Sequence, residues 1–229
     1  MFGLSHVSSL AVTAIAAVFL IKTSIKSTHD AVKKGIGYFI VFLILGGLSL
    51  MVLYKYFAGT FSVHTDLPMQ LCDWAGLMVA ATILWGNTVT FEMAYFWVLS
   101  GSTQALATPD IVENFPSVEF LYFFMVHSGE IIGIFFLIFV LNMYPRKWSV
   151  IRVFLLTNAY LMAAVLVNYI TASNYGYVMH KPPEGSLIDF LGPWPYYILS
   201  LEGVALISYT LCYSPYFFRS MRDKRRWGP

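Results

Sequence analysis

Charged residues and cysteine are the two kinds of side chain that this sequence has little of. Only 11% of its 229 residues are charged, whereas 58% are hydrophobic. A soluble domain has roughly a quarter of its residues charged, so this chain has too little charge to cover a water-exposed surface of its size. Its two cysteines are too few for a disulfide framework. The composition excludes a soluble enzyme and a disulfide-rich secreted domain, and it indicates an integral membrane protein.

Low-complexity tracts, polar linkers and convincing internal repeats are also missing. Without a linker, the length allows a single bundle, and we expect residues 1–229 to form one transmembrane helical domain. Repeat symmetry is common in transporters, and this sequence shows no sign of it.

Seven apolar segments are present, each near the roughly 20 residues that a helix needs to cross a bilayer. Turn-forming or basic residues separate them. We therefore predict an all-α bundle of seven transmembrane helices. The segments cover residues 4–21, 37–57, 67–86, 91–108, 118–143, 149–171 and 194–217.

Basic residues define the expected orientation. No Lys or Arg precedes the first segment, which is the reverse of a cleavable signal peptide. With the N-terminus outside, twelve Lys and Arg fall on the inner side and only Lys55 and Lys181 on the outer side. Such an excess is typical of the cytoplasmic side. We predict an outside N-terminus and a cytoplasmic C-terminus, whose basic tail anchors at the membrane surface and is not expected to bind nucleic acid.

Polar side chains within the segments gather in the outer half of this predicted bundle. At about 1.5 Å per residue, Cys72 and Asp73 lie roughly 10 Å below the outer end of their segment. His127, Glu130 and Glu202 lie roughly 13, 18 and 12 Å below the outer ends of theirs. Ionisable groups at membrane depth face a bundle interior or a wet cavity. We therefore expect one polar pocket that opens to the outer leaflet.

Cys72 with His127 is the sharpest chemical hypothesis. An imidazole that accepts the thiol proton produces a nucleophilic thiolate. Asp73, Glu130 and Glu202 are candidates for orienting that imidazole. The structural alternative is that Cys72 only packs, and that His127 and Glu130, one helical turn apart, share a local hydrogen bond.

The second cysteine, Cys212, lies near the inner end of the last segment. Its expected depth differs from that of Cys72 by about 15 Å, beyond the ~7 Å that a disulfide allows between Cα atoms. Cys72 is therefore expected to be a free thiol.

A zinc site is a second chemical reading. His6, His127, Glu130 and Asp73 are the side chains that would hold the ion, and zinc would activate water against an ester or amide. No two histidines share a segment, so we assign neither a metal nor a cofactor.

The outer loop at residues 171–195 is rich in aromatic residues, proline and glycine. Such a loop either anchors the bundle at the interface or, at this length, forms a lid that binds a head group. The candidates for binding the substrate or its oxyanion are Gln70, Gln104, Asn168, Asn174, Tyr175, Lys181 and Trp194.

A set of motifs in segments three to seven resembles the YwaF-type family of bacterial integral membrane proteins. The motifs are LPMQLCD (67–73), AYFW (94–97), LATPD (106–110), HSG (127–129), NYGY (174–177), KP (181–182) and SLIDFLGPWPYYI (186–198). That family is similar to eukaryotic acyltransferases that move polyunsaturated acyl chains onto lyso ether phospholipids, and more remotely to hydrolases of fatty-acid esters of hydroxy fatty acids. The resemblance implies that Cys72 and His127 form the catalytic pair. We expect relatives to carry histidine where this chain has Gln70.

Together, the residues and the resemblance predict a lipid acyltransferase, transacylase or acyl-ester hydrolase in the bacterial plasma membrane. Its substrate would be a phospholipid or lysolipid of the bilayer. The alternative is a small transporter or lipid-binding membrane protein without catalysis, whose acids carry protons or bind a head group. The sequence does not indicate an oligomeric state.

Overall fold

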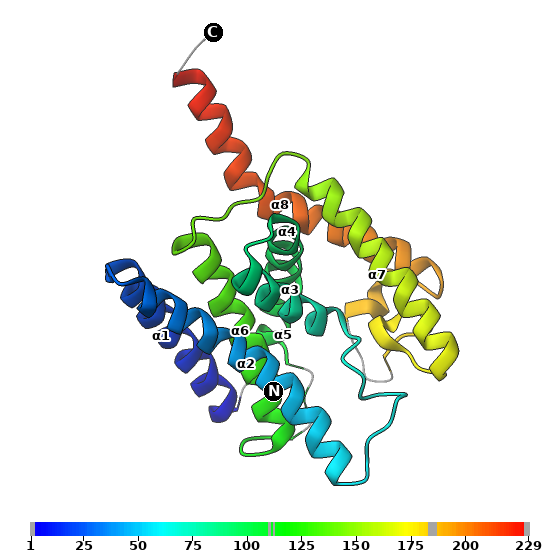
Figure 1. Cartoon of the computed structure of the whole chain (residues 1–229). Coiled ribbons are helices and arrows are strands. Elements are labelled where there is room, and N and C mark those ends of the chain that lie inside the picture. Colours follow the sequence, from blue (N-terminus) through cyan, green and yellow to red (C-terminus); the bar gives the residue numbers. More distant parts are fainter. Residues whose placement is uncertain (1–2, 110, 112, 183–186, 227–229) are drawn as a thin grey trace. The chain divides into compact units, whose positions relative to one another are not determined.

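The computed structural model describes residues 3–109, 111, 113–182 and 187–226, so Asp110 and residues 183–186 of the predicted loops lie outside the described part. Figure 1 shows the helices in chain order. They are α1 (Leu4–Lys26), α2 (Asp30–Phe57), α3 (Leu71–Trp85), α4 (Thr88–Trp97), the π-helical segment η1 (Val98–Ser102), α5 (Thr103–Ala107), α6 (Val118–Phe139), α7 (Ser149–Thr171), the 3-10 turns η2 (Tyr175–Tyr177) and η3 (Leu187–Leu191), and α8 (Tyr196–Arg226).

The all-α prediction is confirmed for the described residues, which contain helices and no strand. A helix, or a run of helices in the case of α4, η1 and α5, lies at each of the seven predicted segments. Within the described residues, five helices are long and apolar enough to cross a membrane, namely α1, α2, α6, α7 and the 196–218 part of α8. The count of seven spans and their orientation stay predictions.

The start of α3 differs from the prediction. The third segment was expected to become helical near residue 67, and α3 begins at Leu71. The physical reason is a cap, because the Asp73 carboxylate accepts the Gln70 backbone N–H at 3.0 Å and so satisfies a donor in front of the first turn. Cys72 therefore lies in the first turn of α3 rather than well inside it.

The chain divides into two compact units. The first comprises Met1–Ser62 and Asp66–Met143, and the second Val63–Thr65 and Tyr144–Pro229. Each is described by itself, and the expectation of one domain over residues 1–229 stays a prediction.

In the first unit α6 is the central helix, and it contacts α1, α2, α3, α4, α5 and η1. Figure 1 shows α1 and α2 running beside it. Glycines allow this close packing, because a Cβ at Gly129 would come within 2.8 Å of Ile44 and one at Gly133 within 2.4 Å of Val79. Small residues at such positions let helix backbones approach each other in a membrane.

The second unit is built from α7 and α8, with η2 and η3 in the connection between them. The hydroxyls of Thr157 on α7 and Tyr209 on α8 lie 3.0 Å apart and join the two helices in their buried interface.

Candidate functional site

Cys72 carries a free thiol at the start of α3. Cys72 is half-buried, whereas most of its polar neighbours are fully enclosed. The backbone N–H groups in the first turn of a helix have no carbonyl partner within that helix. Cys72 lies in the first turn of α3, with the Asp73 carboxylate and the Glu130 carboxyl among its neighbours.

Asp73, the next residue, is buried at 4% exposure. One of its carboxylate oxygens accepts the Gln70 N–H at 3.0 Å, and the other accepts the hydroxyl of Tyr122 on α6, also at 3.0 Å. One oxygen thus caps the start of α3, and the other holds it against α6. The structure gives Asp73 a positioning role, and Gln70 the role of the residue that caps α3.

Glu130 on α6 is fully buried at 0% exposure. Its carboxyl lies against the backbone of α3 at Gly76, where an added Cβ would come within 2.9 Å of Glu130 Oε1. Neither carboxyl oxygen has a protein hydrogen-bond partner of normal geometry. A buried polar group in this condition is exceptional and calls for an explanation.

Ser102, the last residue of η1, is the second such group. It is also 0% exposed, and its Oγ makes no hydrogen bond of normal geometry. The hydroxyl lies beside both the Cys72 thiol and the Glu130 carboxyl. We call Cys72, Asp73, Ser102, Tyr122 and Glu130 the thiol site. π-Helical segments such as η1 occur often at functional positions.

His127 is buried on α6 one turn before Glu130. Its Nδ1 lies 2.8 Å from the Phe123 carbonyl oxygen, and its ring packs on the Phe123 ring at 4.2 Å between centroids. Because a carbonyl only accepts, the Nδ1 nitrogen carries a proton, and in the neutral ring the lone pair is on Nε2.

The Phe123 carbonyl therefore orients the imidazole, a role that the sequence analysis offered to Asp73, Glu130 or Glu202. No hydrogen bond joins His127 to Cys72, both of which are described residues. Glu202 is half-buried on α8 in the second unit, and Gln104 is exposed on α5.

In the second unit, the side chains predicted to bind a head group make hydrogen bonds to backbone groups of that unit. Both ends of the buried Asn168 amide bind Tyr175, since Nδ2 donates to its carbonyl at 2.9 Å and Oδ1 accepts its N–H at 2.7 Å. The Tyr175 hydroxyl donates to the Val63 carbonyl at 2.8 Å. These contacts fasten the loop after α7.

The same loop holds Asn174, Lys181 and Trp194 through further local bonds. Asn174 Oδ1 accepts the Met179 N–H at 3.0 Å, and Trp194 Nε1 donates to the Val178 carbonyl at 3.1 Å. Lys181 Nζ lies 3.8 Å from an Asp189 carboxylate oxygen. These residues therefore stabilise the loop through contacts within it.

The zinc alternative needs several ligands in one place. His6 Nε2 lies 2.9 Å from the Leu106 carbonyl oxygen, so this nitrogen is engaged with the backbone. In the described part of the chain, no three His, Cys, Asp or Glu side chains are grouped so that they could hold a metal ion.

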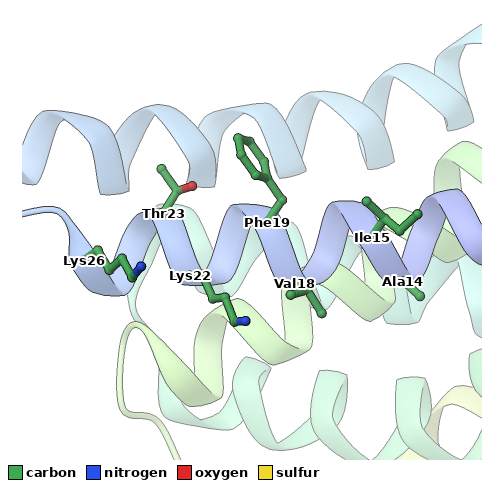
Figure 2. Close-up of a pocket in the computed structure, with 7 residues that line it drawn as sticks. All are labelled: Ala14, Ile15, Val18, Phe19, Lys22, Thr23 and Lys26. Atoms are coloured by element: carbon green, nitrogen blue, oxygen red, sulfur yellow. The ribbon is translucent and has the colours of Figure 1, made fainter.

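A separate pocket is lined by residues of α1, which Figure 2 shows as sticks. Ala14, Ile15, Val18 and Phe19 give it an apolar floor, and two lysines of the last turns lie at one end. An apolar helix face that ends in lysines is typical of a surface that faces lipid, because the amines reach the interface. None of the thiol-site residues lines this pocket.

Sequence reasoning missed Ser102, Tyr122 and Gly76 as parts of the site. Their only signal was a hydroxyl or a small residue within an apolar segment. Which way each one faces depends on the helix register of η1 and on the packing of α3 against α6.

Comparison with known proteins gives one match. The model of the TMEM164 family matches residues 1–213. No curated protein and no solved structure matches the chain.

Proposed function

The chain belongs to the TMEM164 family, a family of multipass membrane proteins, and we propose that it is a lipid acyltransferase or acyl-ester hydrolase with Cys72 as its nucleophile. The observation that carries the proposal is the free thiol of the half-buried Cys72 at the start of α3, beside two buried polar side chains with incomplete hydrogen bonding. Polar groups of this kind are costly among apolar helices, and a role in chemistry accounts for their presence.

The proposed reaction has two halves. In the first, the sulfur of Cys72 attacks an acyl ester, the bond from the carbonyl carbon to the lipid oxygen breaks, and an acyl thioester forms. The thiol proton ends on the leaving lipid hydroxyl. In the second half, a lysolipid hydroxyl or water attacks the thioester, and its proton restores the thiol.

Two features of the site support this proposal, one for stabilising negative charge and one for accepting a proton. Backbone N–H groups in the first turn of a helix have no carbonyl partner within it, and those of α3 that the Gln70–Asp73 cap does not use are suited to the oxyanion of each tetrahedral intermediate. His127, with its tautomer defined by the Phe123 carbonyl, offers Nε2 as an acceptor for the hydroxyl that leaves or attacks. We further propose that the protein lies in the bacterial plasma membrane and that its site opens to the outer leaflet.

The test is an acyl-transfer assay with purified protein in lipid nanodiscs. A phospholipid with an isotopically labelled acyl chain is incubated with an unlabelled lysophospholipid, and the label is followed by mass spectrometry. We expect label on the lysolipid for a transferase and as free fatty acid for a hydrolase. Cys72→Ser abolishes the movement, and His127→Ala lowers it by roughly 10² or more. Cys212→Ser, the matched control on α8, leaves it unchanged.

If native protein moves no label from phospholipids with any of the bacterial head groups tested, the proposal is contradicted and the transport or lipid-binding alternative is favoured. Equal activity in native protein and Cys72→Ser would exclude Cys72 as the nucleophile.

A further inference from the structure

The pocket on α1, which is distinct from the thiol site, has an apolar part and a basic end. We call it the α1 pocket, and its lining consists of Ala14, Ile15, Val18, Phe19, Lys22, Thr23 and Lys26. We infer that the α1 pocket binds an anionic phospholipid of the bilayer, with an acyl chain along the apolar residues and the phosphate at the two lysines. No thiol-site residue lines the pocket, so this binding does not depend on the chemistry proposed for Cys72.

The packing of α1 against α6 determines which face of α1 carries the pocket. Thr13 is buried on the packed face, where its hydroxyl lies 2.7 Å from the hydroxyl of Ser128 on α6. Ser24 is buried as well. The pocket residues lie on the other side of the helix, and Ile15 and Phe19 are 69% and 66% exposed. Since α1 is long and apolar enough to span a membrane, this exposed face meets lipid.

The basic end of the pocket has positive charge that the described residues do not neutralise. Lys22 and Lys26 are exposed and one helical turn apart, so both amines can reach the same anion. Neither forms an ion pair or a side-chain hydrogen bond with any other described residue. Lys33, in contrast, lies 4.0 Å from Asp30. The two ammonium groups therefore complement a phosphate, whose oxygens accept charge-assisted hydrogen bonds.

The length of the pocket fits one leaflet of a bilayer. From Ala14 to Lys26 the helix rises about 18 Å, and half of the hydrocarbon core is about 15 Å. Figure 2 shows both lysines at one end of the row and Ala14 and Ile15 at the other. A phosphate at the lysines therefore leaves its acyl chain along Val18 and Ile15, directed toward the middle of the bilayer.

A lipid fits this surface better than a second copy of the chain. Lipid tails are as apolar as the helix face, so hydrophobicity does not drive two such faces together in a membrane. Two parallel copies joined here would also bring both pairs of lysines close to each other, and like charges repel. In the predicted orientation the lysine end lies at the cytoplasmic surface, where anionic lipids attract basic residues.

The test measures lipid binding to the purified full chain in detergent by native mass spectrometry. The protein is titrated with phosphatidylglycerol, which is anionic, or with phosphatidylcholine, whose head group has no net charge. We expect native protein to bind one phosphatidylglycerol about tenfold more tightly than phosphatidylcholine, or better. Lys22→Gln and Lys26→Gln should each lower that affinity about fivefold, which is the effect of one lysine near an anionic surface.

Matched variants separate the pocket from general charge and general bulk. Lys147→Gln removes a lysine that lies between α6 and α7 and does not line the pocket, and it should bind like native protein. Replacing both pocket lysines together, Lys22→Arg with Lys26→Arg, keeps the charge and should keep the preference. Ala14→Phe fills the apolar end and should weaken binding, whereas Ala163→Phe, at an exposed position of α7, should not.

Equal affinity for the two lipids would overturn the inference. Equal losses in Lys147→Gln and in the two pocket variants would do the same, because they would show a diffuse basic surface. Glycerol phosphate has the charge but no acyl chain, so displacement of phosphatidylglycerol by an equal concentration of it would also contradict the role of the apolar residues. A dimer that Ala14→Phe converts to monomer would show that a second copy covers this face.

Discussion

The buried polar side chains around Cys72 differ in how completely they are hydrogen-bonded. Asp73 has a donor on each carboxylate oxygen, whereas Glu130 and Ser102 have none of normal geometry. A satisfied buried acid stabilises the packing around it, and an unsatisfied one costs free energy that a function must justify. At this scale Asp73 and Tyr122 hold the packing together, and Glu130 and Ser102 are the buried groups whose hydrogen bonding is incomplete.

This division predicts the stability of variants at Asp73. Asp73→Ala leaves the Gln70 N–H and the Tyr122 hydroxyl without their acceptor, so we expect the unfolding free energy to fall by about 1–3 kcal/mol. Tyr122→Phe should cost about 0.5–1.5 kcal/mol, and the double variant less than the sum of the two. Denaturant titration in detergent micelles measures all three.

Tyr38→Phe is the matched control, because Tyr38 on α2 is 60% exposed and its change should lie within about 0.5 kcal/mol of zero. Strict additivity of Asp73→Ala and Tyr122→Phe would contradict a direct bond between the two side chains.

Sequence reasoning selected Cys72, Asp73 and Glu130 from their chemistry and approximate depth, and the structure brings all three together. Depth alone did not show which way each side chain points. Glu130 faces α3 at Gly76, while His127, only three residues earlier, faces the Phe123 carbonyl. Two residues one helical turn apart therefore contact different partners.

Among the elements, η1 is the one that sequence patterns did not predict. Its residues, Val98–Ser102, read as a continuation of an apolar helix. An α-helix and a π-helix differ in hydrogen-bond register rather than in composition, so only the structure reveals that Ser102 turns into the core. The shifted start of α3 is a different case. Gln70 and Asp73 can be read from the sequence, but they were not recognised there as a helix cap.

The packing of α6 against α3 predicts a second set of stability changes. Gly133→Ala places a Cβ within 2.4 Å of Val79, and overpacking of this kind costs about 1–3 kcal/mol. Gly35→Ala on α2 is the control, since nothing lies within 4 Å of its added Cβ and alanine favours a helix by up to about 1 kcal/mol. Thermal unfolding in detergent should separate the two variants, and equal stability would contradict the close approach of α3 and α6.

For the whole molecule, hydrophobic runs were enough to locate the helices, because length and apolar character are what a bilayer demands. They were not enough to count the spans. The 15 residues of α3 reach only about 22 Å, short of the ~30 Å hydrocarbon core, and α4 ends after 10 residues, where η1 begins. A seven-span arrangement with opposite sides for the two termini therefore remains a prediction.

Labelling of single cysteines tests that arrangement. In a Cys72→Ser, Cys212→Ser background, Thr28→Cys reports on the connection between α1 and α2, and Thr60→Cys on the connection between α2 and α3. Positive charge around the first connection predicts that it is cytoplasmic. A membrane-impermeant maleimide applied to intact cells should label Thr60→Cys at once and Thr28→Cys only after permeabilisation. The opposite order would invert the topology.

The central claim is that Cys72 carries the acyl chain during the reaction. Intact-protein mass spectrometry after incubation with mixed bacterial phospholipids tests it most directly. We predict an added mass equal to one acyl group, removed by hydroxylamine and absent from Cys72→Ser, with the mass identifying the chain. Native protein whose mass stays unchanged while labelled acyl chains move would show that the reaction proceeds without a thioester, and would contradict the claim.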